Sequence, residues 1–227
     1  MARADRASHD LETRERLLHA AAQLFAERGF ERVTVRDICR EGRANVAAVN
    51  YHFGDKLGLY REVLQTAVHA MRGTLEAAQA AGAGGSPEDR IRAYVRVFLD
   101  RVVGPDRDSW IQRLMSRELA DPTPALDLIV QQAIVPRMAY LSGLMAQILD
   151  CPADDERAAL GAFSLHAQCV LVVPNPVAAR LYPNFTMTAK AIAGLADHIA
   201  MFSIAGIRAM KSAAAPQAKA PRRRRPL

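Results

Sequence analysis

Cysteine is scarce in this sequence, and its placement excludes two classes of small fold. The 227 residues hold three cysteines, Cys39, Cys151 and Cys169, at long and irregular spacings. Neither a disulfide framework nor a zinc module has this pattern, so an apolar core in a reducing compartment is expected to hold the chain together. Hydrophobic residues make up 50% of the chain, which is enough for such a core. We expect a cytoplasmic protein.

Signatures of catalysis are missing. The sequence contains no nucleophile elbow, no glycine-rich phosphate loop and no HExxH pair. We therefore expect no enzyme activity and no cofactor.

Segments typical of secreted or membrane proteins are missing as well. Residues 1–10 alternate arginine, aspartate and alanine without an apolar stretch, which is unlike a signal peptide. Residues 158–174 carry no charged side chain, but this stretch of 17 residues includes Ser164, His166 and Gln168. A transmembrane helix needs about 20 mostly apolar residues. A buried helix explains the stretch better, and we expect no membrane partner.

Most of the chain has no net charge. The formal charge is +6, but the last seventeen residues hold six basic residues and no acid, so residues 1–210 sum to zero. Residues 1–60 carry ten arginine and lysine residues against nine acidic ones. A basic tail of this kind can hold a polyanion without regard to its sequence. Selective recognition by the rest of the chain must come from individually placed contacts.

Apolar residues return at three- and four-residue steps, and no alternating β pattern lies between turn signals. The sequence therefore predicts an all-α fold. Thr13 is expected to cap the first helix, and Pro136 to kink or divide the helix that contains it. The expected helices cover residues 13–28, 34–42, 46–53, 55–75, 87–102, 109–119, 126–149, 158–174 and 186–210.

These helices group into two domains. We expect a three-helix N-terminal domain within residues 11–71, a six-helix C-terminal domain over residues 86–210, and a disordered basic tail over residues 211–227. The two short helices within residues 34–53 have the spacing of a helix-turn-helix, whose second helix enters the major groove of DNA. From spacing alone, an ordinary corner between two bundle helices is an equal alternative.

Short motifs in residues 13–64 favour the helix-turn-helix. They are residues 13–18 (TRERLL), 22–30 (AQLFAERGF), 34–38 (TVRDI) and 51–53 (YHF), followed by Lys56. In this order and register they resemble the DNA-binding domain of the TetR family of bacterial one-component transcriptional regulators. Residues 44–56, 117–118 and 122–127 are similar to the CecR-like (YbiH-like) branch of that family.

One position departs from the family pattern. Arg43 stands in the turn where members often carry glycine. Either Gly42 takes the left-handed backbone conformation, or Arg43 accepts a strained one. In the second case Arg43 lies at the mouth of the groove and is a candidate for a phosphate or base contact.

The resemblance implies a DNA-reading surface around the second short helix. In that role Val46 and Ala47 suit thymine methyl groups, and Asn50 suits the two-pronged edge of adenine. Packing against the first helix is the alternative for Tyr51, and it is the preferred role for Phe53, which has no polar tip. The expected DNA contacts are Thr34, Arg36, Arg43, Asn45, Val46, Ala47, Asn50, Tyr51, His52 and Lys56.

The resemblance also implies a homodimer and an effector pocket. The last two helices would pair between two copies as a four-helix bundle, and the other C-terminal helices would enclose a small, mostly apolar or aromatic effector. The expected function is a repressor on a palindromic operator that controls efflux or drug-tolerance genes. Candidate lining residues of the pocket are Trp110, Arg113, Met115, Tyr140, His166 and Cys169.

Alternatives remain open for these residues and for the function. Core packing is the alternative for most of the six. His166 and Cys169 lie three apart, but the nearby sequence offers no further ligand, and no metal is expected. Arg113 and Arg117 either attract an anionic effector or form a solvated face. The alternative function is a helical interaction or small-molecule-binding protein that does not bind an operator.

The position of the basic tail leads to a test. Because all the excess charge lies after residue 210, we expect Arg222 to Arg225 to add only non-specific, salt-sensitive affinity for DNA. Deleting residues 212–227 should make the dependence of log Kd on log salt concentration less steep, measured by fluorescence anisotropy. The preference for operator over random DNA should remain, and a lost preference would contradict the expectation.

Overall fold

The structure, a computed structural model, describes residues 2–104, 109–172, 180–181 and 186–214. This part of the chain is helical throughout, as the sequence predicts, with no strand among the described residues. The elements are α1 (Ala2–Arg28), α2 (Val35–Glu41), α3 (Val46–Phe53), α4 (Lys56–Ala81), α5 (Pro87–Val103), α6 (Ser109–Ala120), α7 (Leu126–Ile129), the π-helix η1 (Val130–Ile134), α8 (Val135–Leu149), α9 (Glu156–Leu171) and α11 (Ala189–Ala214).

Several predicted helix boundaries were wrong, and α4 ends at Ala81 instead of residue 75. Helix α1 begins at Ala2, and Thr13 lies inside it, where its hydroxyl donates to the carbonyl of His9 one turn earlier at 2.9 Å. Thr13 is therefore not a helix cap. At the other end α11 continues to Ala214, so residues 211–214 of the expected tail are helical. Arg222 to Arg225 and most of the loop expected over residues 173–184 lie outside the described residues.

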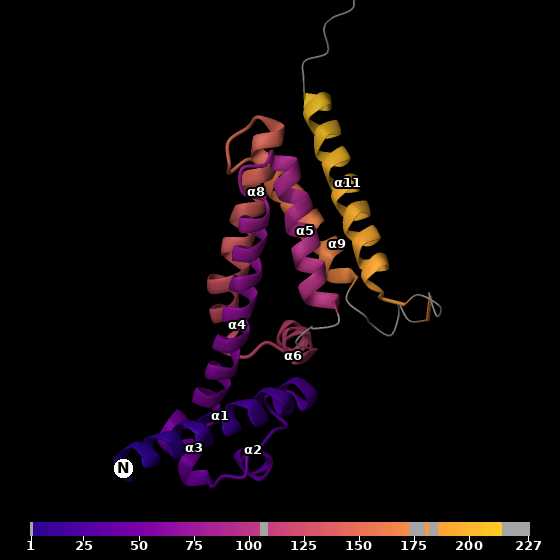
Figure 1. Cartoon of the computed structure of the whole chain (residues 1–227). Coiled ribbons are helices and arrows are strands. Elements are labelled where there is room, and N and C mark those ends of the chain that lie inside the picture. The colour runs from indigo at the N-terminus through magenta and orange to yellow at the C-terminus, as the bar shows by residue number, and fades with distance from the viewer. Residues whose placement is uncertain (1, 105–108, 173–179, 182–185, 215–227) are drawn as a thin grey trace, which may run out of the picture.

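Two apolar clusters lie along one long helix (Figure 1). The N-terminal core contains, among others, Leu17, Phe25, Ile38, Val49, Leu59, Tyr60, Val63 and Leu114. The C-terminal core contains, among others, Tyr94, Phe98, Leu99, Leu141, Met145, Leu165, Cys169 and Ile199. Helix α4 enters both, because Leu64 and Val68 pack in the first and Leu75 and Ala78 in the second. In Figure 1 it rises from the group of α1, α2 and α3 into the bundle of α5, α8, α9 and α11.

The predicted interruption at Pro136 takes the form of a π-helix. Proline has no N–H to donate to the carbonyl four residues earlier, and its ring clashes with that carbonyl. The helix widens into the π-helix η1 at Val130–Ile134 and continues as α8, whose second residue is Pro136. Helix α7 and η1 pack in the N-terminal core, and α8 packs in the C-terminal core. The irregular segment therefore lies where the two cores meet.

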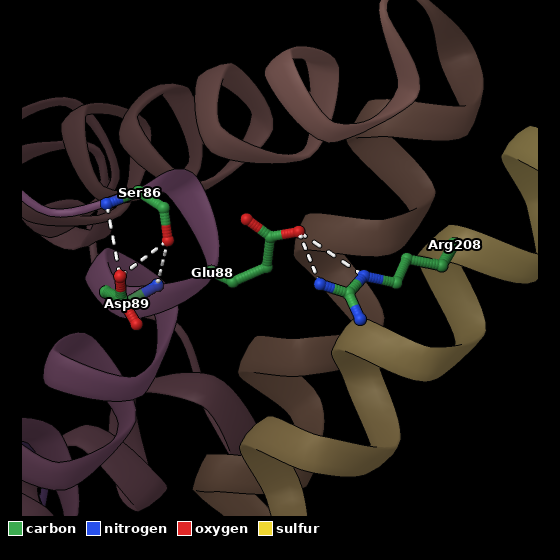
Figure 2. A network of polar contacts seen from close by, with 4 residues as sticks. All are labelled: Ser86, Glu88, Asp89 and Arg208. Atoms are coloured by element: carbon green, nitrogen blue, oxygen red, sulfur yellow. Dashed lines mark hydrogen bonds and ion pairs between the residues drawn. The ribbon is translucent and has the colours of Figure 1, made fainter.

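Helix α5 begins with a capping box and is tied to α11 (Figure 2). The hydroxyl of Ser86 accepts from the amide of Asp89, whose carboxylate accepts from the amide and hydroxyl of Ser86. One residue before Asp89, Glu88 accepts two hydrogen bonds from Arg208 at 3.0 and 3.3 Å. A hydrogen bond from its own backbone amide and the bonds from Arg208 lower the pKa of Glu88.

Helix α11 is apolar along its length. Residues Ala189–Ala213 are long and apolar enough to cross a membrane by length and composition, a test that core helices of soluble proteins also pass. Helix α11 packs on α5, α8 and α9, and 33% of its most apolar window is buried inside the subunit. Much of its surface thus remains uncovered in a single copy.

Candidate nucleic-acid interface and sensor core

The start of α2 is a closed capping box. The Thr34 hydroxyl accepts from the amide of Asp37 at 3.2 Å and donates to its carboxylate at 2.6 Å, and the Thr34 amide donates to the same carboxylate at 3.1 Å. These hydrogen bonds lower the pKa of Asp37. The predicted DNA contact of Thr34 would therefore have to share its hydroxyl and amide with Asp37. The next predicted contact, Arg36, is exposed on α2.

Arg43 carries the left-handed conformation of the turn. Its φ is +50°, whereas Gly42 has an ordinary φ of −79°, so the second of the two alternatives holds. Gly42 serves close packing instead, because a Cβ there would lie 3.3 Å from a methyl group of Leu17 and 3.2 Å from the carbonyl of Ile38. The amide of Ala44 donates to the carbonyl of Cys39, which closes the turn. The exposed Arg43 side chain is left at the start of α3.

Helix α3 presents one polar and small-residue face to solvent. Asn45 caps it, and its side-chain oxygen accepts from the amide of Ala48 at 2.8 Å. The opposite face is fixed because Val49 and Phe53 are buried in the N-terminal core. The residues predicted to read bases all lie on the exposed face, and they are Val46, Ala47 and Asn50, with Tyr51 beside them.

The aromatic residues at the end of α3 divide between surface and core. Tyr51 is 77% exposed, so its packing alternative is wrong, while Phe53 is 9% exposed, as preferred. His52 is half-buried, and its ring makes edge contacts with the rings of both neighbours. Lys56 starts α4 with its ammonium group 4.2 Å from the ring centre of Phe30. Of the three predicted DNA contacts Tyr51, His52 and Lys56, Tyr51 is the most exposed.

Two adjacent residues of α6 attach this helix to the N-terminal core. The Arg117 guanidinium donates to the backbone carbonyls of Ala26 and Glu27, which are unpaired acceptors at the end of α1. Arg117 also carries a positive charge to the negative end of that helix. The neighbouring Glu118 is 1% exposed and accepts from the Tyr60 hydroxyl of α4 at 2.5 Å. In the sequence this pair is part of the similarity to the CecR-like branch, and neither residue was expected to hold α6 in place.

The six predicted pocket residues do not lie together. Trp110 and Met115 of α6 pack against the N-terminal core, and the exposed Arg113 donates to Gln23 of α1 at 3.4 Å. The other three lie in or against the C-terminal core, where Tyr140 contacts the ring of Tyr94, His166 contacts the ring of Phe98, and Cys169 is buried.

Arg137 is the residue of this core that sequence reasoning missed. It is 3% exposed on α8, among the residues around His166 and Cys169. A signal was available, because Arg137 is the only charged residue between Asp127 and Asp150. Within the described residues, no group of three or more His, Cys, Asp or Glu side chains could hold a metal ion.

Comparison with known proteins identifies the family. The family model of the bacterial TetR-type regulatory proteins matches residues 17–63. The model of the C-terminal domain of the transcriptional dual regulator CecR matches residues 87–207, more than half of the chain. The chain belongs to the TetR family. It is a TetR-family transcriptional regulator with an N-terminal DNA-binding domain and a CecR-type C-terminal domain.

Curated relatives and solved structures agree with the TetR-family assignment. The dual regulator CecR of Shigella flexneri is 29% identical over 165 residues, which cover 68% of this chain and 72% of that protein. The regulator BetI of Rhizobium meliloti is 28% identical over 155 residues, 67% of this chain and 73% of BetI.

Two solved structures illustrate the shared fold. A TetR-family regulator from Streptomyces coelicolor has a TM-score of 0.64 at 20% identity, with 87% of this chain and 96% of that one covered. The regulator AibR, solved in complex with isovaleryl coenzyme A and operator DNA, has a TM-score of 0.62 at 20% identity, with 83% and 97% covered.

Arg43 leads to a test that separates backbone strain from DNA contact. A left-handed conformation costs a residue with a Cβ roughly 1–2 kcal/mol, so Arg43→Gly should raise the free energy of unfolding by about 1 kcal/mol. If the side chain contacts a phosphate, the same variant should bind operator about tenfold more weakly and with a salt slope smaller by about one. Chemical denaturation and fluorescence anisotropy measure the two effects.

Arg43→Lys is the matched control, because it keeps both the charge and the Cβ. It should leave stability and salt slope close to those of the parent protein. An Arg43→Gly protein that is more stable but binds operator with native affinity would support backbone strain at Arg43 and contradict a phosphate contact.

Proposed function

We propose that this chain is a ligand-responsive repressor that binds a palindromic operator as a homodimer. The observation that carries the proposal is the exposed face of α3, where Val46, Ala47 and Asn50 lie above a buried face that fixes their direction. Small side chains let a helix backbone approach base edges closely, and the amide of Asn50 can pair with adenine. The N-terminal part carries almost no net charge, so these placed contacts must supply the selectivity.

The dimer is supported by an uncovered apolar surface on the last two helices. On α9 exposed apolar side chains recur at helical spacing, and on α11 two large exposed apolar side chains are neighbours in the sequence. Burying a side chain of this size contributes about 1.5–3 kcal/mol, so six in each copy favour association. The exposed residues are Leu160, Phe163, Val170, Leu171, Met201 and Phe202.

Response to a ligand is supported by the contacts of α6 with the N-terminal core and by the course of α4 through both cores. Arg117 and Glu118 fix α6 on α1 and α4, and α4 continues from the DNA-binding domain into the C-terminal core. A ligand that moves α6 or α4 would therefore move α3 as well. In a dimer this changes the spacing of the two reading helices, which must match half-sites about 34 Å apart.

The proposed target genes rest on the resemblance to the CecR-like branch, and the second candidate function is weighed against the exposed face of α3. Efflux or drug-tolerance genes remain the proposed targets on the strength of the CecR-like resemblance, and the proposed location is the cytoplasm, where operator DNA lies. An interaction or small-molecule-binding protein without operator binding remains the second candidate. The exposed reading face of α3 counts against it, since such a protein has no need of that face.

A footprint on the DNA upstream of the gene tests the proposal. We expect a protected palindrome at moderate salt. Phe163→Asp should sediment as a monomer and lose the protection, because a single reading domain buries too little surface for tight binding. Phe163 is 66% exposed in a single copy, so the subunit should remain folded.

Leu119→Asp is the matched control, since Leu119 is equally apolar and 74% exposed, but on α6. It should stay dimeric and keep the footprint. Absence of any protected palindrome from the native protein would contradict operator binding. Protection that survives in monomeric Phe163→Asp would contradict the dimer.

A further inference from the structure

A buried and uncompensated cation lies in the C-terminal core. Arg137 is 3% exposed, and its guanidinium donates to the backbone carbonyl of Met71 at 3.2 Å and lies 5.3 Å from the ring centre of Phe98. Its Nε has no hydrogen-bond partner among the described residues. Within the same part of the chain no carboxylate lies within ion-pair distance of it. A charge buried in this way is rare unless something pairs with it.

The titratable neighbours of Arg137 do not supply a negative charge. Burial raises the pKa of Tyr94 and raises that of the Cys169 thiol to about 12, so both are neutral at pH 7. Burial and the positive charge of Arg137 lower the pKa of His166 to about 4, so the imidazole is neutral too. Burial also lowers the pKa of Arg137 itself, but a guanidinium stays protonated. Arg137 and these three described neighbours therefore carry one net positive charge between them.

A second polar group lies nearby without a partner. Tyr140 follows Arg137 by three residues on α8, on the same side of the helix. Its hydroxyl is buried and has no hydrogen-bond partner among the described residues. The Tyr140 ring lies 6.5 Å from that of Tyr94, whose own hydroxyl is 3.1 Å from Nδ1 of His166. Two orphaned donors, one of them charged, thus face a cluster of aromatic rings.

From this arrangement we infer that the C-terminal core binds a small aromatic carboxylate, with the carboxylate on Arg137 and Tyr140 and the ring among Phe98, Tyr94 and His166. The inference rests on the proposed ligand response and names the chemical class of the ligand. A planar guanidinium matches a carboxylate, and a phenol can add a further hydrogen bond to it. The aromatic neighbours match a flat apolar body.

Arg137 also contacts α4, so a ligand bound to Arg137 could affect the DNA-binding domain through this helix. Its present acceptor is the carbonyl of Met71 on α4, the helix that starts at Lys56 beside the reading helix. A carboxylate competes with that carbonyl for the guanidinium. Binding of the ligand would therefore loosen one attachment of α4 to α8.

The test compares matched anionic and neutral probes on the full chain. Benzoate and 2-naphthoate are titrated against benzamide and 2-naphthamide by calorimetry and by thermal unfolding. We expect each acid to bind at least tenfold more tightly than its amide and to raise the unfolding temperature. Arg137→Met should remove this preference, and Tyr140→Phe should weaken acid binding severalfold while leaving amide binding unchanged.

Arg96→Met is the matched control. Arg96 lies on α5 with its side chain 52% exposed in an ion pair with Asp197, so this variant should keep the preference for acids. If Arg137→Met does not fold, Tyr140→Phe alone decides the outcome, because it keeps the ring and removes only the orphaned hydroxyl.

Three results would overturn the inference. They are equal binding of acids and amides by the native chain, no binding of either, and a preference that survives in the folded Arg137→Met protein or is undiminished in the folded Tyr140→Phe protein. Footprints of the same preparations without probe are run in parallel. If any of these results is obtained while the footprint is intact, the carboxylate site is contradicted but operator binding is not. A missing footprint contradicts the proposed function itself.

Discussion

The rest of the structure depends on one buried carboxylate. Glu118 of α6 accepts hydrogen bonds from the Tyr60 hydroxyl and from the amide and hydroxyl of Thr123, at 2.5, 2.9 and 2.7 Å. Burial, and then the hydrogen bond to Glu118, raises the pKa of Tyr60, so the phenol remains a donor. Each hydrogen bond to a charged group of this kind contributes roughly 1.5–3 kcal/mol, and an orphaned partner would be costly. Glu118 therefore fixes α6 on α4, while Arg117 fixes it on α1.

This attachment holds α6 in the N-terminal core, and α4 connects that core to the C-terminal core. Tyr60 packs edge-on against Phe25 at 4.9 Å, so the carboxylate is held on the same aromatic cluster that orients α1. From there α4 runs through both cores and meets Arg137 at Met71. The exposed face of α3 is thus positioned by the N-terminal core, which shares α4 with the C-terminal core. A regulator of this type can change operator affinity without a ligand ever approaching the DNA.

The sequence predicts those features whose cause is local. Thr34, Asn45 and Ser86 cap their helices as their side chains allow, and Pro136 interrupts its helix because it lacks an N–H. The direction of α3 follows from the apolar Val49 and Phe53. Features that depend on distant contacts were not predicted. Gly42 is glycine because Leu17 lies against it, and the roles of Glu118 and Arg137 appear only when α4 is beside them.

The most direct test of this account is the operator affinity of Glu118→Met, a variant that keeps the volume of the side chain and removes its acceptors. Anisotropy titrations of the folded dimer should give a Kd for operator at least tenfold higher than that of the native protein, about 1.4 kcal/mol, since the reading helices lose their fixed spacing. Affinity for random DNA should not change, and Glu76→Met on the exposed side of α4 should behave like the native protein. A folded, dimeric Glu118→Met protein with native operator affinity would contradict the claim that this carboxylate positions the reading domain.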